Sequence, residues 1–188
     1  YTRTPDIGLF MHEWKALFDS KSGERGIFNR EAAKKKVAEN GRRDPEHDFG
    51  TNPCSEIILR PYQFCNLTEV VIRATDGEDD LKRKVRIAAT LGTYQSTLID
   101  IKYLRKIWRQ NTEEERLLGV SLTGIMDNKL TIEADEELLR SMREVSVVTN
   151  KELAKKLKIP QSTATTCIKP SGTVLSLIHI SEPTRPYW

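Results

Sequence analysis

The sequence predicts an α/β protein, and three observations support this class. Apolar residues recur at the three- and four-residue spacing of helices in several long stretches. Short β-branched runs, such as residues 67–72, lie between these stretches and are bounded by turn residues. The two kinds of stretch alternate along 188 residues. This order is typical of strands that are covered by helices.

The first part of the chain predicts a helix followed by a strand end. Apolar residues at helical spacing over residues 7–18 form one face of a helix, and residues 21–25 form a polar turn. The apolar pair at residues 27–28 is expected to be the end of a buried strand.

A second helix is predicted from its end signals. Asn29 suits the N-cap of a helix that runs to about Asn40, and Gly41 stands where a glycine ends helices. Turn residues at 50–53 and a short apolar run at 57–59 lead into the strand at 67–72.

The middle of the chain predicts long helical segments. Acidic residues at 76–80 favour the start of a helix near Leu81. Apolar positions at helical spacing continue to Trp108, and we expect a break near Gly92.

The second half predicts a strand, a helix and a strand. Thr112 and Glu115 match a capping box, and residues 120–125 resemble a core strand. A long helix is expected over residues 133–157, because Pro160 ends it, and a short strand is expected over residues 164–168.

The two ends of the chain indicate a fragment. The chain begins with Tyr1 and leads directly into a helix, and residues 175–188 show neither helical nor strand period. This tail resembles translated sequencing-adapter read-through; a genuine flexible tail is the alternative. We therefore expect one domain fragment over residues 1–174 and a non-native tail over residues 175–188.

Composition limits the classes of function. Lys and Arg number 30 against 27 Asp and Glu, so the net charge is +3, and 38% of residues are hydrophobic. No stretch approaches the roughly 20 apolar residues of a membrane span, and no signal peptide is evident. Three cysteines fit a reducing compartment. We expect a cytoplasmic protein with no membrane partner and no nucleic acid partner.

The sharpest chemical signal is a thiol between two polar side chains. In an extended segment Asn52, Cys54 and Glu56 would point to the same side. A carboxylate near a thiol disfavours the thiolate, which argues against a hydrolytic nucleophile. The trio suits chemistry in which sulfur moves a hydrogen atom and the carboxylate moves a proton. A polar turn with a buried cysteine is the alternative interpretation.

The other two cysteines are less informative. Cys65 follows Cys54 by eleven residues, which is no zinc-ligand spacing, and the three histidines are scattered, so we expect no metal site. Cys65 is compatible with redox cooperation with Cys54 or with a buried strand position. Cys167 lies in an apolar run and is interpreted as a core residue.

A possible phosphate-binding turn follows the last predicted strand. The turn over residues 169–174 combines Pro and Gly with two hydroxyl residues, although it lacks the full P-loop pattern. The basic stretches at residues 34–36 and 42–43 are interpreted as a solvated helix face and loop.

Four motifs in this order resemble the large catalytic chain of ribonucleotide reductases. They are residues 50–57 (GTNPCSEI), 60–70 (RPYQFCNLTEV), 117–124 (LLGVSLTG) and 169–174 (KPSGTV). These motifs and residues 22–30 (SGERGIFNR) look like the branch that uses adenosylcobalamin and ribonucleoside triphosphates. The resemblance covers roughly residues 5–174.

The resemblance implies a ten-stranded α/β barrel with a central finger loop, of which this chain would form part. By the same resemblance, Cys54 becomes the thiyl radical that removes the ribose 3′-hydrogen, Glu56 takes the 3′-hydroxyl proton, and Asn52 holds the ribose hydroxyls. Cys65 would be one of two reducing thiols. The nucleotide phosphates would bind to Ser171, Gly172, Thr173 and Val174.

The resemblance also implies partners and a limitation. A thioredoxin-like reductant and a nucleotide effector would act on the parent protein, to make deoxyribonucleotides for DNA synthesis. The second reducing thiol would belong to a segment outside this chain, so we expect the fragment alone to be inactive. Ser55 stands where many members of the family have Gly, a change that we expect to be tolerated.

Two other functions stay open at this point. One is the large chain of an iron-dependent or diphosphate-using reductase, with the same core and another radical source. The other is a non-catalytic nucleotide-binding module, in which the cysteines are merely buried.

Overall fold

The computed structural model describes residues 6–21, 26–133 and 136–169. The central layer is a parallel pair of strands, β3 (Asn66–Val71) and β4 (Leu118–Thr123), in the register Asn66↔Leu118 to Val71↔Thr123. On the other edge of β4, residues 164–168 run parallel to it, with one bridge between Val120 and Thr166. The predicted strand over these residues is therefore confirmed only as a short pairing.

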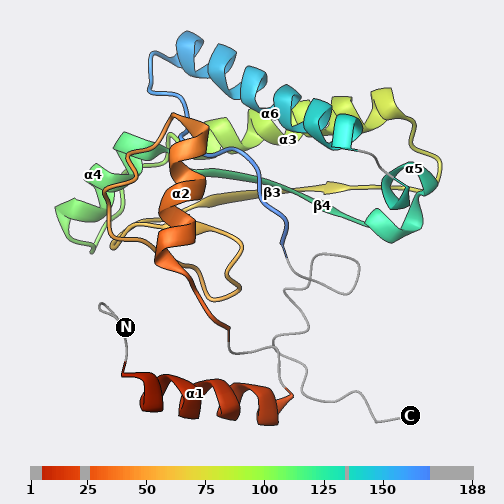
Figure 1. Ribbon diagram of the computed structural model, residues 1–188. Helices are drawn as coiled ribbons and strands as arrows, with labels where there is room; N and C mark the ends of the chain where they lie inside the picture. Colours follow the sequence, from red (N-terminus) through yellow and green to blue (C-terminus); the bar gives the residue numbers. More distant parts are fainter. Residues whose placement is uncertain (1–5, 22–25, 134–135, 170–188) are drawn as a thin grey trace.

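Two long helices cover one face of this sheet. Helix α3 (Glu78–Gln95) and helix α6 (Glu136–Leu157) lie side by side over β3 and β4 (Figure 1). Their apolar stripes and the apolar side chains of the strands form the core. Its buried members are Val70, Ile72, Leu81, Val85, Ala88, Ala89, Leu118, Val120, Leu122 and Met142.

Helix α3 differs from the predicted break at Gly92. The helix continues through this residue, and a Cβ atom there would lie 2.8 Å from Leu118 Cδ1. The glycine therefore serves close approach of the helix to the sheet, and the break comes at Ser96. Sequence alone does not separate these two uses of glycine.

Helix α4 (Lys106–Glu115) shows that the predicted capping box is wrong. Thr112 lies inside this helix and donates its hydroxyl to the Trp108 carbonyl at 2.8 Å, and the helix ends at Glu115. The motif residues are present, but the Glu115 carboxylate pairs with Arg43 instead of with the backbone at a helix start.

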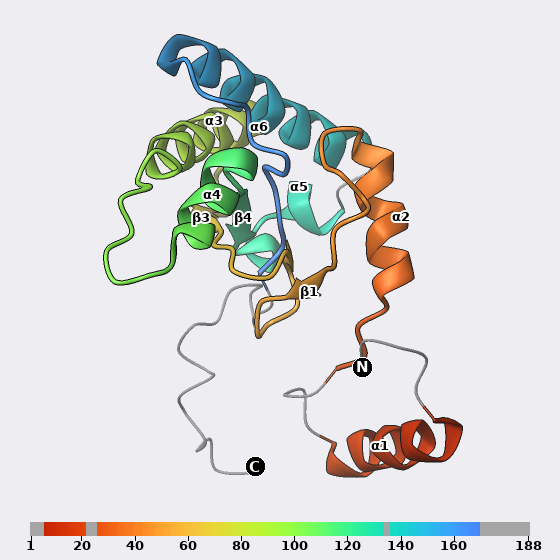
Figure 2. The same cartoon turned by 90° about the vertical axis from the view of Figure 1, so that its left-hand side faces the viewer.

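The first two helices follow their predicted boundaries. Helix α1 (Ile7–Ser20) begins after the N-cap Asp6 and buries none of its residues, and it stands apart from the sheet in both views (Figures 1 and 2). Helix α2 (Arg30–Asn40) has Asn29 as its N-cap and Gly41, at φ 61°, as its C-cap, as predicted. Ile27 is 59% exposed and lies outside any strand, so the expected buried strand end is wrong.

The remaining elements are short. Strands β1 (Gly50–Thr51) and β2 (Ile58–Leu59) form an antiparallel hairpin. The turns η1 (Ile125–Asp127) and α5 (Lys129–Ile132) join β4 to α6. A search of the described helices for a segment able to cross a bilayer finds no candidate.

The α/β class is confirmed by this arrangement. The described residues contain two two-stranded sheets, so a ten-stranded barrel stays a prediction.

Candidate active site

The β1–β2 hairpin carries the predicted thiol on a tight loop. The loop is closed by hydrogen bonds from Ser55 N to Asn52 O at 3.0 Å and from Asn52 N to Ile57 O at 3.3 Å. Ser55 has φ 64°, in the left-handed region that favours glycine. Cys54 is partly buried beside it. The loop is thus turned rather than extended, which differs from the geometry that the spacing predicts.

The loop nevertheless brings Asn52 and Glu56 into contact. Asn52 Nδ2 donates to Glu56 Oε1 at 2.6 Å, and Asn52 Oδ1 accepts from the Ile57 amide at 3.1 Å. These two bonds fix the carboxamide, so that it holds the carboxylate from within the loop.

A lysine from the other end of the chain holds the same carboxylate. Lys169 Nζ lies 2.6 Å from Glu56 Oε1, and the two side chains are only 6% and 2% exposed. Among the described residues, none donates to Glu56 Oε2, although this atom is buried. Both donors therefore bind the same carboxylate oxygen, Oε1, and Oε2 is left as an acceptor.

The uncovered face of the sheet presents two further thiols. By the register of β3 and β4, Leu67 lies opposite Gly119, and Cys65 is two residues before Leu67 on the same face. The Cys167 amide bonds to the Val120 carbonyl at 3.1 Å. A Cβ atom on Gly119 would lie 2.9 Å from Cys167 Sγ, so glycine makes room for this sulfur.

Burial keeps these two thiols protonated. Burial, then the nearby Glu56 carboxylate, raises the pKa of the Cys65 thiol. Burial, followed by Glu56 and Cys65, raises the pKa of Cys167 to about 12. Cys167 is partly exposed and has charged neighbours, so its interpretation as a core residue is wrong. Protonated thiols suit hydrogen transfer better than nucleophilic attack.

The lysine remains charged despite its burial. Burial alone would lower the pKa of Lys169, but hydrogen bonds with Glu56 and Cys54 outweigh it, and the net pKa is raised. The ammonium and the carboxylate thus form a buried ion pair.

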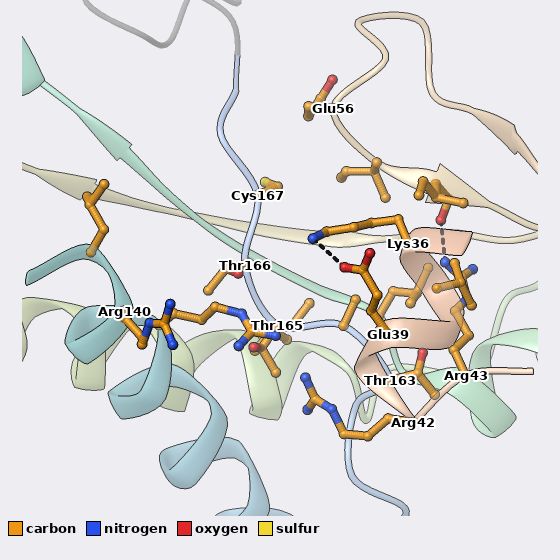
Figure 3. Close-up of a pocket in the computed structure, with 18 of the residues that line it drawn as sticks. Lys36, Glu39, Arg42, Arg43, Glu56, Arg140, Thr163, Thr165, Thr166 and Cys167 are labelled. Carbon is orange, nitrogen blue, oxygen red and sulfur yellow. Dashed lines mark hydrogen bonds and ion pairs between the residues drawn. The ribbon is translucent and has the colours of Figure 1, made fainter. Parts of the chain in front are cut away.

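A cavity of about 800 Å³ opens on one side of this cluster. Figure 3 shows Glu56 and Cys167 at one end of the cavity and Arg42 and Arg140 at the other. Cys54 and Cys65 are not among its lining residues. The cavity therefore reaches the carboxylate and the third thiol from the side of α2 and α6.

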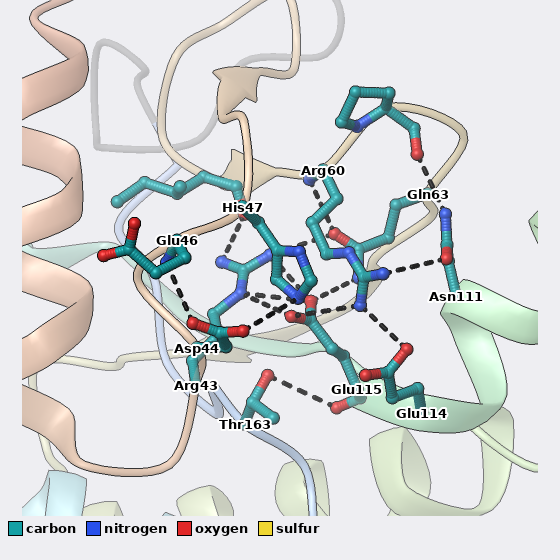
Figure 4. Close-up of polar contacts among 12 residues, drawn as sticks. Arg43, Asp44, Glu46, His47, Arg60, Gln63, Asn111, Glu114, Glu115 and Thr163 are labelled. Carbon is teal, nitrogen blue, oxygen red and sulfur yellow. Dashed lines mark hydrogen bonds and ion pairs between the residues drawn. The ribbon is translucent and has the colours of Figure 1, made fainter.

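A second buried ion pair supports the base of the hairpin (Figure 4). Arg43 Nη2 lies 2.8 Å from Glu115 Oε2, and both side chains are 4% exposed. Arg43 also donates to the Ile58 carbonyl at 2.8 Å and to Gln63 Oε1 at 2.9 Å. The interpretation of Arg43 as a solvated loop residue is wrong, because this network buries it against strand β2.

The structure thus brings together Asn52, Cys54 and Glu56 on one loop, and Cys65 directly precedes strand β3. The predicted phosphate-binding residues Ser171, Gly172, Thr173 and Val174 lie outside the described residues. Within the described ranges, no group of three His, Cys, Asp or Glu side chains is arranged to hold a metal ion.

Sequence reasoning missed Lys169 as a partner of Glu56. Its position at the start of the predicted phosphate turn is the single local signal, and that signal predicts another role. The ion pair spans 113 residues of chain, so that local spacing does not reveal it.

Comparison with known proteins gives one consistent result. The chain is 35% identical over 117 residues to an adenosylcobalamin-dependent ribonucleoside-triphosphate reductase of Lacticaseibacillus paracasei. The alignment covers 60% of this chain and 15% of that protein. It is 28% identical over 193 residues to the reductase of the same name from Lactobacillus leichmannii, covering 86% of this chain and 26% of that protein. The chain thus spans about a quarter or less of the curated relatives that it matches.

A solved structure agrees with these relatives. The crystal structure of a B-12 dependent (class II) ribonucleotide reductase matches with a TM-score of 0.52 and 25% identity, over 66% of this chain and 21% of that chain. No model of a protein family matches the sequence.

Over the aligned residues, this chain is therefore similar to part of a ribonucleotide reductase. Within that class, the relatives and the solved structure are of the B12-dependent type.

Proposed function

We propose that the protein to which this chain belongs reduces ribonucleoside triphosphates to 2′-deoxyribonucleotides by radical chemistry on Cys54. The observation that carries the proposal is the Glu56 carboxylate beside Cys54. It is held by Asn52 and Lys169 through Oε1, while its buried Oε2 has no donor among the described residues. A buried acceptor without a donor fits a substrate hydroxyl.

The loop residues divide the first step between them. A thiyl radical on Cys54 takes the hydrogen atom from ribose C3′, so that the sulfur becomes a thiol and the radical moves to carbon. Glu56 accepts the proton of the 3′-hydroxyl through Oε2. Asn52, already fixed by the Ile57 amide, orients the hydroxyls against this carboxylate.

Two thiols complete the reduction. The C2′–OH bond breaks and the hydroxyl leaves as water, while two thiols give two hydrogens and two electrons and become a disulfide. Cys65 supplies one of these thiols, and its raised pKa keeps the hydrogen on sulfur until it is needed. The other thiol comes from another segment of the parent protein. The Cys54 radical is restored when C3′ takes the hydrogen back, and Glu56 returns the proton to the 3′-oxygen.

The residues present fit the cofactor that the relatives' names state. Cys54 is only partly buried on its loop, so its thiol can be reached from outside the chain. When bound, adenosylcobalamin supplies the radical that removes the hydrogen of this thiol. Burial beneath the remainder of a ten-stranded barrel, with the hairpin as its finger loop, would keep water from the radical.

The remaining parts of the proposal concern binding. The substrate phosphates bind to the turn over Ser171, Gly172, Thr173 and Val174, through backbone amides and hydroxyls. A thioredoxin-like protein reduces the disulfide, a nucleotide effector regulates the parent protein, and the enzyme works in the cytoplasm. The 188-residue chain alone is inactive, because the second thiol lies elsewhere.

The test uses the protein expressed from its full reading frame. Turnover of a ribonucleoside triphosphate is measured with adenosylcobalamin and a dithiol, for the wild type, Cys54→Ala and Ser55→Ala. We expect Cys54→Ala to lose all turnover and the neighbouring Ser55→Ala to keep it. Reduction that survives in Cys54→Ala would contradict the proposal, and turnover only with a metal-containing small subunit would indicate the iron-dependent branch.

A further inference from the structure

The ion pair between Lys169 and Glu56 joins two distant parts of the fold. The Lys169 amide donates to Ser121 Oγ at 3.0 Å, which fixes its backbone to strand β4. Its ammonium then reaches the hairpin loop, where it lies 2.6 Å from Glu56 Oε1. The lysine therefore ties the sheet to the loop that carries Cys54.

The geometry at the carboxylate is one-sided. Asn52 and Lys169 both donate to Oε1, each at 2.6 Å. The Glu56 side chain is 2% exposed, so water cannot take the place of these donors without a cost in free energy. Two donors on one oxygen fix the orientation of the carboxylate and leave Oε2 as its single open acceptor.

The charge of the lysine also matters. A charged donor makes a stronger hydrogen bond to a carboxylate than a neutral donor does, so the ammonium fixes this side chain more firmly than a neutral residue would. The raised pKa of Lys169 shows that the ammonium stays charged at neutral pH beside Glu56 and Cys54.

We propose that Lys169 is a positioning residue for the reduction, which acts through Glu56 by holding its carboxylate oriented with Oε2 open. This inference rests on the function proposed above. It adds a residue to the four predicted phosphate-binding residues and to the thiols.

The experiment uses the full-reading-frame protein with Lys169→Met, Lys169→Arg, Glu56→Gln and the double variant. Lys155→Met, on the exposed side of α6, is the matched control. We expect Lys169→Met to lower kcat about 10²–10³-fold with KM changed less than about threefold, within the range of a positioned proton acceptor. Lys155→Met retains wild-type kcat.

Two further readouts separate positioning from a structural role. Arginine keeps a charged donor at this position, so Lys169→Arg should recover most of the kcat that Lys169→Met loses. In the Glu56→Gln background, Lys169→Met should lower kcat less than about twofold further, because the lysine acts through that carboxylate.

Each outcome decides the inference. A kcat per folded molecule within twofold of wild type in Lys169→Met, or a loss that adds in full to that of Glu56→Gln, overturns it while the proposed function stands. A wild-type protein that reduces no ribonucleotide overturns the proposed function, and the positioning role is then overturned with it.

Discussion

The two faces of the β3–β4 sheet share one backbone and differ in chemistry. The face under α3 and α6 carries buried apolar side chains: Val70, Ile72, Leu118, Val120 and Leu122. The uncovered face, on which neither helix lies, adds to the apolar Leu67 and Val71 two thiols, an acid, a hydroxyl and a glycine: Cys65, Cys167, Glu69, Ser121 and Gly119. Because successive side chains of a strand alternate, one strand serves both faces.

The comparison shows that the covered face stabilises the fold, whereas the uncovered face carries the reactive groups. The covered face buries hydrocarbon, which favours folding. On the uncovered face, burial raises the pKa of Glu69 despite its hydrogen bond with Ser121, and Glu69 Oε1 has no partner in the described ranges. Polar groups there lose solvent without full compensation. Four predictions test this division, in order of decreasing effect.

The largest effect is expected from Leu81→Ala on the covered side. Leu81 is fully buried in α3 against the sheet, so that truncation leaves a cavity and should cost about 3–5 kcal/mol of unfolding free energy. Urea denaturation measures it. Leu91→Ala, on an exposed part of the same helix, should change stability by less than about 0.5 kcal/mol. Equal losses in both variants would refute the covered-face core.

Asn150→Ala should come second, because Asn150 joins the covered side to the segment that leads to Cys167. Asn150 Nδ2 donates to Thr93 Oγ1 and to Ser162 Oγ, and its Oδ1 accepts from the Ser162 amide, all at 2.9 Å. Leaving these buried groups unpaired should cost about 2–3 kcal/mol in the same denaturation experiment.

The matched control is Thr149→Ala, whose hydroxyl bonds only within its own helix at Val145. A cost for Asn150→Ala no larger than that of Thr149→Ala would mean that the network does not connect the two regions.

Gly119→Ala should have a smaller effect, on the uncovered face. The added Cβ would lie 2.7 Å from Leu67 Cδ2 and 2.9 Å from Cys167 Sγ, so that side chains must move, at about 1–2 kcal/mol. Alkylation of Cys167, followed by mass spectrometry, should become faster as its sulfur is displaced. Gly50→Ala meets nothing within 4 Å and is the control. Unchanged alkylation in Gly119→Ala would place the thiol elsewhere.

The smallest effect is a dependence of stability on alkaline pH. The pKa of Cys167 is raised from 9.0 to about 12, so between these values the unfolded chain loses a proton that the folded chain keeps. Stability is therefore complete below pH 9 and falls as pH rises toward 12. Because the thiol is partly exposed, we expect a loss below about 1 kcal/mol at pH 10.

Denaturation at pH 8 and pH 10 measures this loss, and Cys167→Ala should reduce it. Leu81→Ala, which touches only the covered face, should keep the wild-type pH dependence. An identical pH slope in Cys167→Ala and the wild type would show that this thiol titrates alike in both states.

Local signals account for the elements that were predicted well. Asn29 and Gly41 mark the two ends of α2 as expected, because a cap is a contact between residues close in sequence. The apolar period likewise located α3 and α6, apart from their ends. The predictions for Glu115 and Gly92 were wrong, because this carboxylate pairs with Arg43 and this glycine contacts Leu118, both more than 25 residues away in the chain. Thr112 lies inside α4 instead of capping it, and its hydroxyl bonds to the Trp108 carbonyl of the same helix.

The chain alone determined the order of helices and strands and placed a thiol, a carboxamide and a carboxylate on one loop, since these depend on neighbours in sequence. Tertiary structure decided which groups surround that loop. The Lys169–Glu56 and Arg43–Glu115 ion pairs span 113 and 72 residues. Opposite charges can be buried only as partners, and which charges become partners depends on how the sheet and helices pack.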